Sequence, residues 1–376
     1  MKRVLLLSAY HAASHMRWCR GLMNYLADWE WTLESLPARF FNWRSRSNSL
    51  TWGVGDYPQL DQSYDLLVVT SMVDLSALKG FRPGLARVPS VVYFHENQFA
   101  YPAREQQQGL LEIQLTSIYT ALAADQVVFN SRFNCDSFLA GARALLAKMP
   151  DAVPANIIGR IKAKSQVLPV PLEDELFEAQ IGRPSTSAPV ELLWNHRWEW
   201  DKGPERLLML AEELAERGYL GPGFKLHVVG EQFRQIPEPF NRLRQLLDDH
   251  DALGHWGYGE SLTDYRDLLA RSHAVISTAT HDFQGLSMIE AALLGCVPFA
   301  PGRLAYPEWF NREHLYTSLP DKPQHEAEKA AAALIQWFYP EGLAGEIAHY
   351  PDEDRNQAFL HLSWRELGPL YRDLLT

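Results

Sequence analysis

Short apolar runs alternate with amphipathic, helix-like segments along almost the whole chain, and this alternation restricts the fold more than any other feature. The runs are rich in Val and Leu and are too short for buried helices, which favours buried strands. Strands joined by helices in this way form parallel sheets that are covered on both faces. The sequence therefore predicts an α/β protein. Its expected strands span residues 3–9, 65–71, 90–95, 126–130, 166–171, 191–195, 225–230, 253–256, 274–278 and 297–300.

The alternation is interrupted once, near the middle of the chain. Residues 182–189 are rich in Gly, Pro, Ser and Thr, and this composition is typical of a linker between domains. A chain of 376 residues can bury two cores. We therefore expect two Rossmann-like domains, residues 1–180 and 181–376, that face each other across a cleft, with the last helix a candidate to cross back to the first domain. Open α/β sheets bind ligands at the carboxyl ends of their strands, so the cleft is the expected site.

Composition and charge limit the classes of function. The formal net charge of −11 argues against a nucleic-acid-binding surface over the whole molecule, although one basic patch stays compatible with it. The sequence contains no run of eighteen or more apolar residues, so we expect no transmembrane helix and no membrane partner. Cys19, Cys135 and Cys296 are far apart and predict neither a disulfide framework nor a metal cluster, which fits a cytoplasmic protein.

The most informative stretch, residues 281–290, joins an expected strand to an expected helix. Gly285 permits close backbone approach, and the first amides of the helix would point at a phosphate. Glu290, about one turn further on, can accept hydrogen bonds from a ribose diol, and Asp282 can hold sugar hydroxyls. An ordinary strand–loop–helix crossover with a solvated carboxylate explains the stretch as well. The candidates here for binding the phosphate, ribose and sugar of a ligand that donates its sugar are Asp282, Gly285, Leu286, Ser287 and Glu290.

Two cations follow the first strand of the second half. Arg197 and Lys202 bracket the loop that leads into the next helix. They can neutralise a diphosphate, Arg197 in bidentate fashion and Lys202 as a point charge, and no divalent metal is then needed. The alternative is that both are surface cations, one of them paired with Asp201 or Glu199.

In the first half, a buried strand ends in the polar run His95-Glu96-Asn97-Gln98. We expect His95 to hydrogen-bond the transferred sugar and Glu96 to face an acceptor. The alternative for His95 is a core histidine that the backbone satisfies. Further candidates are expected at the edge of the sheet where this strand ends. Ser14 and His15 lie at the start of the first helix, and Asn130 lies at the end of another strand. The acceptor-side candidates are Ser14, His15, Arg44, Arg46, Glu96, Asn97 and Asn130.

Two of these candidates belong to a basic and aromatic stretch, residues 39–46, which reads Arg-Phe-Phe-Asn-Trp-Arg-Ser-Arg. Arginines interleaved with aromatic side chains suit a nucleic-acid backbone and stacked bases. A solvated loop with Trp43 anchored in the core explains the stretch at least as well.

The order of the motifs in the second half resembles a known family. Arg197 with Lys202, followed by Asp282, Gly285 and Glu290, resembles the retaining nucleotide-sugar glycosyltransferases of GT-B fold. In that family the acidic pair usually has Glu at both positions, eight residues apart. Here the first position is Asp282, whose shorter side chain keeps the charge.

The chain resembles one group within that family more closely, the tRNA-queuosine α-mannosyltransferases. The resemblance spans nearly the full length, and the His-Glu-Asn-Gln run is specific to the group. The first loop departs from the pattern, since residues 11–15 read His-Ala-Ala-Ser-His where the group often has glycines. The matching segments are residues 14–15, 42–46, 93–98, 128–134, 195–199, 281–285, 306–308 and 363–364.

This resemblance implies GDP-mannose as the sugar donor and queuosine in a tRNA anticodon as the acceptor, with no metal and no permanently bound cofactor. It also implies a front-face reaction, in which the acceptor attacks the face that the diphosphate leaves, so that the anomeric configuration is retained. The catalytic candidates are His95, Arg197, Lys202 and Asp282.

Three other functions stay open on the residues alone. A glycosyltransferase for an envelope sugar or lipid would need a basic or aromatic amphipathic face. A sugar-nucleotide epimerase would convert the donor without any acceptor. A tRNA-binding or nucleotide-sensing module would bind without transfer.

Overall fold

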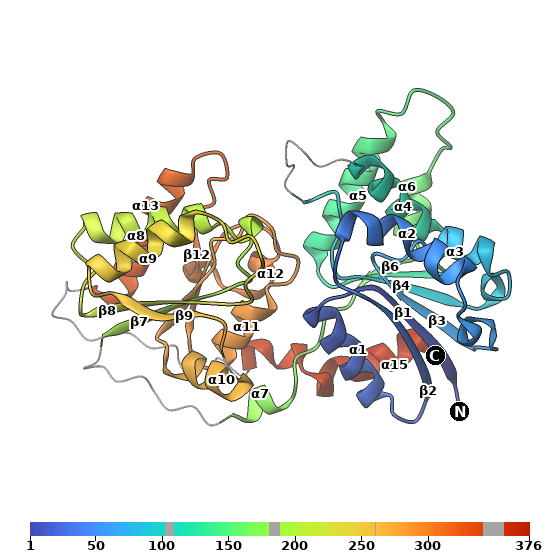
Figure 1. The fold of residues 1–376 in the computed structure, drawn as a ribbon, viewed down its shortest axis with the longest axis horizontal. Helices are drawn as coiled ribbons and strands as arrows, with labels where there is room; N and C mark the ends of the chain where they lie inside the picture. The colour runs from blue at the N-terminus through green and yellow to red at the C-terminus, as the bar shows by residue number, and fades with distance from the viewer. Residues whose placement is uncertain (102–108, 180–188, 260, 341–356) are drawn as a thin grey trace. The chain divides into compact units, whose positions relative to one another are not determined.

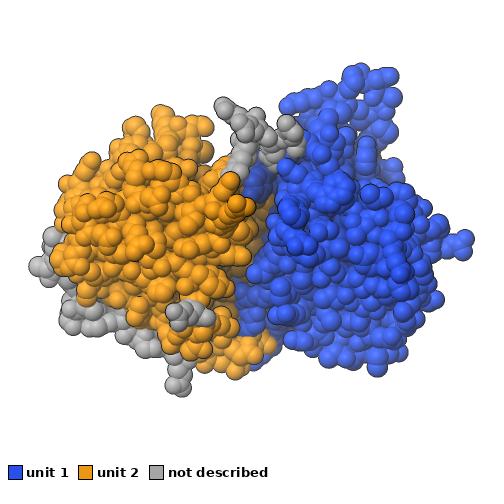
Figure 2. All heavy atoms as spheres, viewed as in Figure 1, with its two compact units in different colours: residues 1–173, 362–376 blue, residues 174–361 orange. Residues whose placement is uncertain are grey.

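The computed structural model describes residues 1–101, 109–179, 189–259, 261–340 and 357–376 (Figure 1). The chain divides into two compact units, coloured separately in Figure 2. Unit 1 comprises Met1–Glu173 and Leu362–Thr376, and unit 2 comprises Asp174–His361. The predicted linker lies outside the described residues except for Pro189.

Unit 1 contains a six-stranded parallel sheet in the order β2-β1-β3-β4-β5-β6. Strands β3 and β4 are buried at every position, because helices cover both faces of the sheet. The strands are β1 Arg3–His11, β2 Glu30–Pro37, β3 Leu66–Thr70, β4 Ser90–Phe94, β5 Gln126–Phe129 and β6 Ser165–Val167.

The C-terminal helix α15 packs on α1 within unit 1. Trp18 donates a hydrogen bond from Nε1 to the Tyr371 hydroxyl at 3.1 Å, and Trp364 stacks on Tyr25 with ring centroids 5.7 Å apart. The helices of unit 1 are α1 Ala13–Tyr25, α2 Phe41–Val54, η1 Pro58–Asp61, α3 Leu75–Phe81, η2 Leu85–Arg87, α4 Leu110–Ala123, α5 Arg132–Leu146, α6 Ile157–Lys162 and α15 Trp364–Leu375.

Unit 2 repeats the architecture with the strand order β12-β11-β10-β7-β8-β9, again parallel. Its strands are β7 Val190–Asn195, β8 Phe224–Val229, β9 Leu253–Gly257, β10 Ala274–Ile276, β11 Val297–Pro301 and β12 Leu315–Tyr316. Its helices are α7 Glu175–Glu178, η3 Trp200–Lys202, α8 Pro204–Glu216, α9 Pro239–Asp249, α10 Leu262–Arg271, α11 Leu286–Leu293, α12 Tyr306–Trp309, η4 Arg312–His314 and α13 Pro323–Phe338. The short helix η5 Leu360–Leu362 spans the point in the sequence where unit 2 ends and the last segment of unit 1 begins. None of the described helices of either unit is long and apolar enough to cross a membrane.

The predicted parallel α/β architecture is confirmed, and each predicted strand has a counterpart. The alternative of a solvated loop around Trp43 is wrong, because these residues begin helix α2. Trp43 is 60% exposed and is not anchored in the core, where Trp52 of the same helix is fully buried.

Candidate functional site

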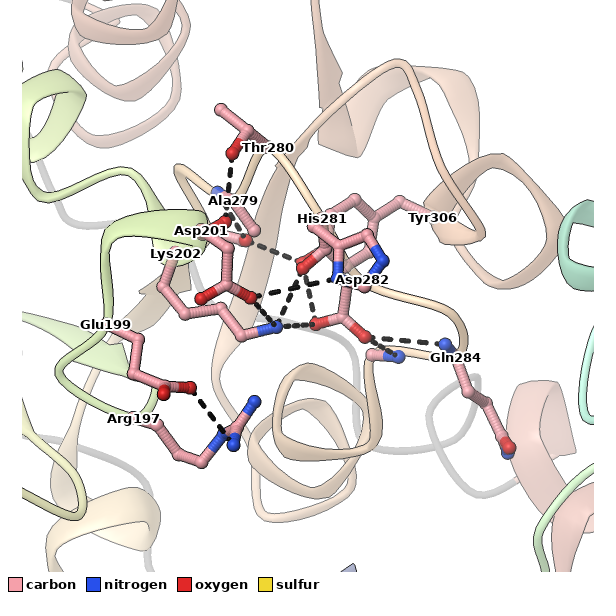
Figure 3. A network of polar contacts seen from close by, with 12 residues as sticks. Arg197, Glu199, Asp201, Lys202, Ala279, Thr280, His281, Asp282, Gln284 and Tyr306 are labelled. Atoms are coloured by element: carbon pink, nitrogen blue, oxygen red, sulfur yellow. Dashed lines mark hydrogen bonds and ion pairs between the residues drawn. The ribbon is translucent and has the colours of Figure 1, made fainter. Parts of the chain in front are cut away.

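In unit 2, the predicted residues gather where the strand order reverses. Strands β7 and β10 are neighbours at the centre of the sheet, with β8 and β9 following on one side and β11 and β12 on the other. Such a switch point leaves a crevice at the carboxyl ends of the two central strands. Lys202 comes from η3 after β7, and Asp282 from the loop after β10. Lys202 Nζ lies 3.6 Å from Asp282 Oδ2. Figure 3 shows the two side chains pointing toward each other.

Lys202 lies among oxygen acceptors and is almost fully buried. Its ammonium donates a hydrogen bond to the His281 carbonyl oxygen at 2.7 Å and lies 3.6 Å from Asp201 Oδ2. The Lys202 side chain is 10% exposed, and the Asp201 side chain is fully buried. The alternative of two surface cations is therefore wrong for Lys202, although Asp201 is its partner as that alternative supposed.

The Asp282 carboxylate is held on both oxygens. Oδ1 accepts a hydrogen bond from the Gly285 amide at 2.8 Å, and Oδ2 accepts one from the Tyr306 hydroxyl at 3.2 Å. Burial raises the pKa of Asp282, but Lys202 and the Gly285 amide outweigh it and leave the pKa below its ordinary value. Asp282 is thus an oriented carboxylate, and it occupies one of the amides that the sequence assigned to a phosphate.

Arg197 has a more open environment than Lys202. Its Nη1 lies 3.0 Å from Glu199 Oε2, and the two side chains are 46% and 32% exposed. An ion pair this accessible contributes little to stability, so the guanidinium can exchange Glu199 for another anion at small cost.

Two histidines in the same cluster are neutral at pH 7. Burial, followed by the charge of Lys202, lowers the pKa of His196 to about 3. Burial also lowers the pKa of His281, against the opposing effect of Asp201. The charge that a ligand meets in this cluster therefore comes from the carboxylates, Lys202 and Arg197.

Helix α11 begins beside this cluster. Gly285, its N-cap residue, has φ of +75°. The Asn195 side chain donates a hydrogen bond from Nδ2 to the Ser287 carbonyl oxygen at 2.9 Å, which ties the end of β7 to the first turn of α11. The predicted residues Leu286 and Ser287 form that turn, and Glu290 lies half-buried one turn further along the helix.

In unit 1, the strand order reverses between β1 and β3, and a second polar cluster lies there. Glu96, just after β4, accepts a hydrogen bond on Oε1 from the Ser71 hydroxyl at 3.0 Å. Its Oε2 lies 3.3 Å from His15 Nε2. The His15 ring stacks on His95 with centroids 4.2 Å apart. The segments after β1, β3 and β4 thus converge on one carboxylate.

His95 is buried in an aromatic cage that includes Trp18 and Tyr93. Its Nε2 has no hydrogen-bond partner within the described residues. Burial, followed by the charge of His15, holds the pKa of His95 well below its ordinary value. His95 is therefore a neutral imidazole, and its Nε2 is a buried polar atom without a hydrogen bond among the described residues.

The other predicted residues of unit 1 do not join this carboxylate. Asn97 Nδ2 donates to Asn134 Oδ1 at 2.8 Å, and Asn130 Nδ2 donates to the His95 carbonyl oxygen at 2.9 Å, so both amides brace the strand ends. Ser14 is exposed in the first turn of α1. Arg44 and Arg46 lie on α2, and Arg46 Nη2 is 3.6 Å from Glu112 Oε2.

Comparison with known proteins identifies the family. The family model described as tRNA-queuosine alpha-mannosyltransferase N-terminal matches residues 3–172. A tRNA-queuosine alpha-mannosyltransferase of Drosophila melanogaster is 36% identical over 325 residues, which cover 84% of this chain and 83% of the fly protein. The chain belongs to the tRNA-queuosine alpha-mannosyltransferase family.

Solved structures similar to this family member have the GT-B fold. HepE of Anabaena, in complex with UDP, has a TM-score of 0.66 and 13% identity, over 100% of this chain and 99% of that chain. Sucrose-phosphate synthase from Thermosynechococcus elongatus has a TM-score of 0.64 and 14% identity over the same shares. At such identities the likeness shows the fold alone, and the predicted GT-B fold is confirmed.

Sequence reasoning missed two residues of this queuosine-mannosyltransferase family member that hold the predicted carboxylates. Ser71, which holds Glu96, is the last position of a predicted strand, where its polarity was a usable signal. Tyr306, which holds Asp282, begins one of the matching segments, but the sequence contained no sign of its partner. Among the described residues, no three His, Cys, Asp or Glu side chains are arranged to hold a metal ion.

Gly285→Ala tests how tightly this cluster is packed. A Cβ at Gly285 would lie 2.8 Å from the Tyr306 ring, in addition to the strain of positive φ. Gly218 has a similar φ of +77° with nothing within 4 Å of a Cβ, so Gly218→Ala measures the backbone strain alone. We expect each alanine to lower the free energy of unfolding by about 1 kcal/mol through strain. Gly285→Ala should lower it further in urea denaturation, and equal losses would show that Tyr306 moves aside freely.

Proposed function

We propose that this family member is a retaining glycosyltransferase that moves mannose from GDP-mannose onto queuosine in a tRNA anticodon. Its membership of the family and its likeness to the fly relative support the reaction. The GT-B neighbour HepE, solved with UDP, supports a nucleotide-sugar donor. The observation that carries the proposal is the pairing of Lys202 with Asp282 beside the start of α11, at the switch point of unit 2.

In this proposal, unit 2 binds the donor. Arg197, Lys202 and the first amides of α11 bind the diphosphate and stabilise the negative charge that grows on it as the glycosidic bond breaks. Glu290 accepts hydrogen bonds from the ribose, and Asp282 orients the sugar hydroxyls. The fixed position of Asp282 between Gly285 and Tyr306 suits such an orienting role.

The groups of unit 1 serve the sugar and the acceptor. The neutral imidazole of His95 hydrogen-bonds a sugar hydroxyl, and Glu96, held by Ser71 and His15, receives the acceptor. The acceptor oxygen forms a bond to the anomeric carbon while the bond from that carbon to the diphosphate oxygen breaks. The departing phosphate oxygen takes the acceptor proton, so no protein nucleophile is needed and the configuration is retained.

A transfer assay tests the proposed function. The protein is incubated with GDP-mannose and tRNA that carries queuosine, beside tRNA that lacks it, and the digested nucleosides are weighed by mass spectrometry. We expect one hexose to be added to queuosine only. Addition from another nucleotide sugar would correct the donor, conversion of the donor without acceptor would indicate an epimerase, and a lack of transfer from every donor would contradict the proposal.

We also expect transfer to persist in EDTA. Arg197 and Lys202 supply positive charge at the diphosphate, which in a metal-dependent enzyme comes from the ion. The measurement is the initial rate with EDTA beside the rate with added Mg²⁺. A rate that EDTA abolishes and Mg²⁺ restores would show that these cations are not sufficient.

A further inference from the structure

Two large aromatic side chains are exposed at the start of α2. Phe40 is 72% exposed and Trp43 is 60% exposed. Phe40 also has left-handed backbone angles, φ 55° and ψ 54°. Bulky residues rarely adopt this conformation, because its steric strain costs about 1–3 kcal/mol. Phe40 is thus exposed on a strained backbone and Trp43 is exposed on the helix that follows, although the burial of either ring would be favourable.

The same segment is basic. Residues 39–54 contain three arginines and no carboxylate, in a chain whose formal net charge is −11. The Arg39 guanidinium lies 5.8 Å from the Phe40 ring centroid, and Arg46 follows Trp43 by three positions on the helix, which places both on one face. We call Arg39, Phe40, Trp43 and Arg46 the α2 surface.

The α2 surface lies on the same rim of the sheet as Glu96. Strand β2 runs parallel to β1, so its carboxyl end, which leads into α2, is at the edge where β1, β3 and β4 also end. Two contacts fix the helix to this rim. The Phe41 ring lies edge-on to Tyr10 at 5.5 Å, and Asn48 Nδ2 donates a hydrogen bond to the Met72 carbonyl oxygen at 2.9 Å, next to Ser71.

Aromatic rings interleaved with arginines on an otherwise acidic protein match one class of ligand. Unpaired bases stack on aromatic side chains whatever their sequence, and arginines bind the phosphates between them. A paired stem offers only its phosphates, because its bases are already stacked. We propose that the α2 surface binds an unpaired RNA loop by stacking bases on Phe40 and Trp43, and that it does so next to the acceptor groups of unit 1.

This inference rests on the proposed tRNA acceptor but is tested without sugar transfer. The probes are a synthetic RNA hairpin with an unpaired anticodon-type loop that lacks queuosine and a fully paired duplex of the same length. Binding is measured by fluorescence anisotropy for Phe40→Ala and Trp43→Ala. The matched control is Tyr119→Ala, which removes an aromatic side chain that is 49% exposed on α4. Thermal unfolding of each variant controls for folding.

We expect Phe40→Ala and Trp43→Ala each to weaken hairpin binding at least about fivefold, equivalent to about 1 kcal/mol, and Tyr119→Ala to leave it unchanged. Duplex binding should change less than hairpin binding. Arg46→Glu should weaken binding and flatten its salt dependence more than Arg87→Glu, which reverses an exposed charge in η2.

Several results would overturn the inference. The first is a wild-type protein that does not bind the hairpin. The second is that Phe40→Ala and Trp43→Ala bind the hairpin as tightly as Tyr119→Ala does. The third is that the protein self-associates, and that Trp43→Ala abolishes this self-association while RNA binding persists. The last result would assign the surface to a second copy of this chain. Intact hairpin binding without transfer to queuosine would contradict the proposed function and leave the α2 surface standing, so the two failures are distinguishable.

Discussion

Lys202→Met should destabilise the protein and remove most of its transfer activity. Met preserves the volume of the side chain but leaves the Asp201 and Asp282 carboxylates without the ammonium that lies 3.6 Å from each. Removing one partner of a buried ion pair costs about 3–5 kcal/mol in the free energy of unfolding, because a buried charge is left uncompensated. If Lys202 also meets the charge that develops on the diphosphate, turnover should fall about a hundredfold or more.

The control for this variant is Lys225→Met. Lys225 Nζ lies 3.0 Å from Asp251 Oδ1 in a pair whose acidic partner is 77% exposed, so its removal should change stability by about 0–1 kcal/mol. Urea denaturation of both variants gives the comparison. Equal losses for the two lysines would mean that Lys202 does not compensate the buried carboxylates.

The dependence of stability on pH gives a second test of Lys202. In the wild type the pKa values of Asp201 and Asp282 are lowered, so the stability they contribute is present above the ordinary pKa of Asp and is lost only as the pH falls below it. Without Lys202, burial raises both pKa values, and stability is lost as the pH rises through them. The deficit of Lys202→Met should therefore be smaller at about pH 5 than at about pH 7.5.

Strands with a continuous apolar run are the least ambiguous in the sequence. β3 and β4 are buried at every position, and an unbroken run of Val and Leu has few other interpretations in an α/β protein. The strands that the sequence missed, β2 and β12, lie at sheet edges. In β2 only one of the eight positions is buried, and its sequence lacks the continuous apolar run of β3 and β4.

Trp43 shows why exposure could not be read from composition. Trp43 and Trp52 are nine positions apart, or about two and a half helical turns, so in one helix they lie on opposite faces. Once residues 41–54 form α2, only one of the two can be buried, and it is Trp52. The sequence stretch alone did not determine that the segment is helical, so it could not exclude a buried Trp43.

The candidate site was predictable as residue types but not as contacts. Lys202 and Asp282 each follow a predicted strand, and the parallel sheet brings both to one edge. The Tyr306 hydroxyl that holds Asp282 comes from α12, beyond the next strand, and no local pattern links the two. Likewise, the stacking of His15 on His95 depends on how α1 packs against β4, which is a tertiary property.

Arg197→Ala should reduce transfer about a hundredfold or more while leaving stability nearly unchanged. The Arg197 side chain is 46% exposed, and pairs with a partner this exposed contribute little to folding energy. A guanidinium that meets charge only as the donor bond breaks contributes mainly to kcat, so kcat should fall without an increase in KM of comparable size. Arg197→Lys should recover part of the rate, because it keeps the charge and loses the bidentate fork.

Arg242→Ala is the matched control for Arg197. Arg242 also forms an exposed pair in unit 2, with Nη2 3.1 Å from Glu212 Oε1, so its removal alters the net charge equally without touching the candidate site. Its transfer rate should equal that of the wild type.

The two site variants together separate stability from turnover. Lys202→Met is expected to lower both, whereas Arg197→Ala should lower turnover alone. Any loss of rate in a fully stable protein must come from the chemistry of the site. If the transfer rate falls less than about threefold in both Arg197→Ala and Lys202→Met, these cations do not bind the sugar donor. A single group that stabilises charge in the transition state contributes far more to the rate than that.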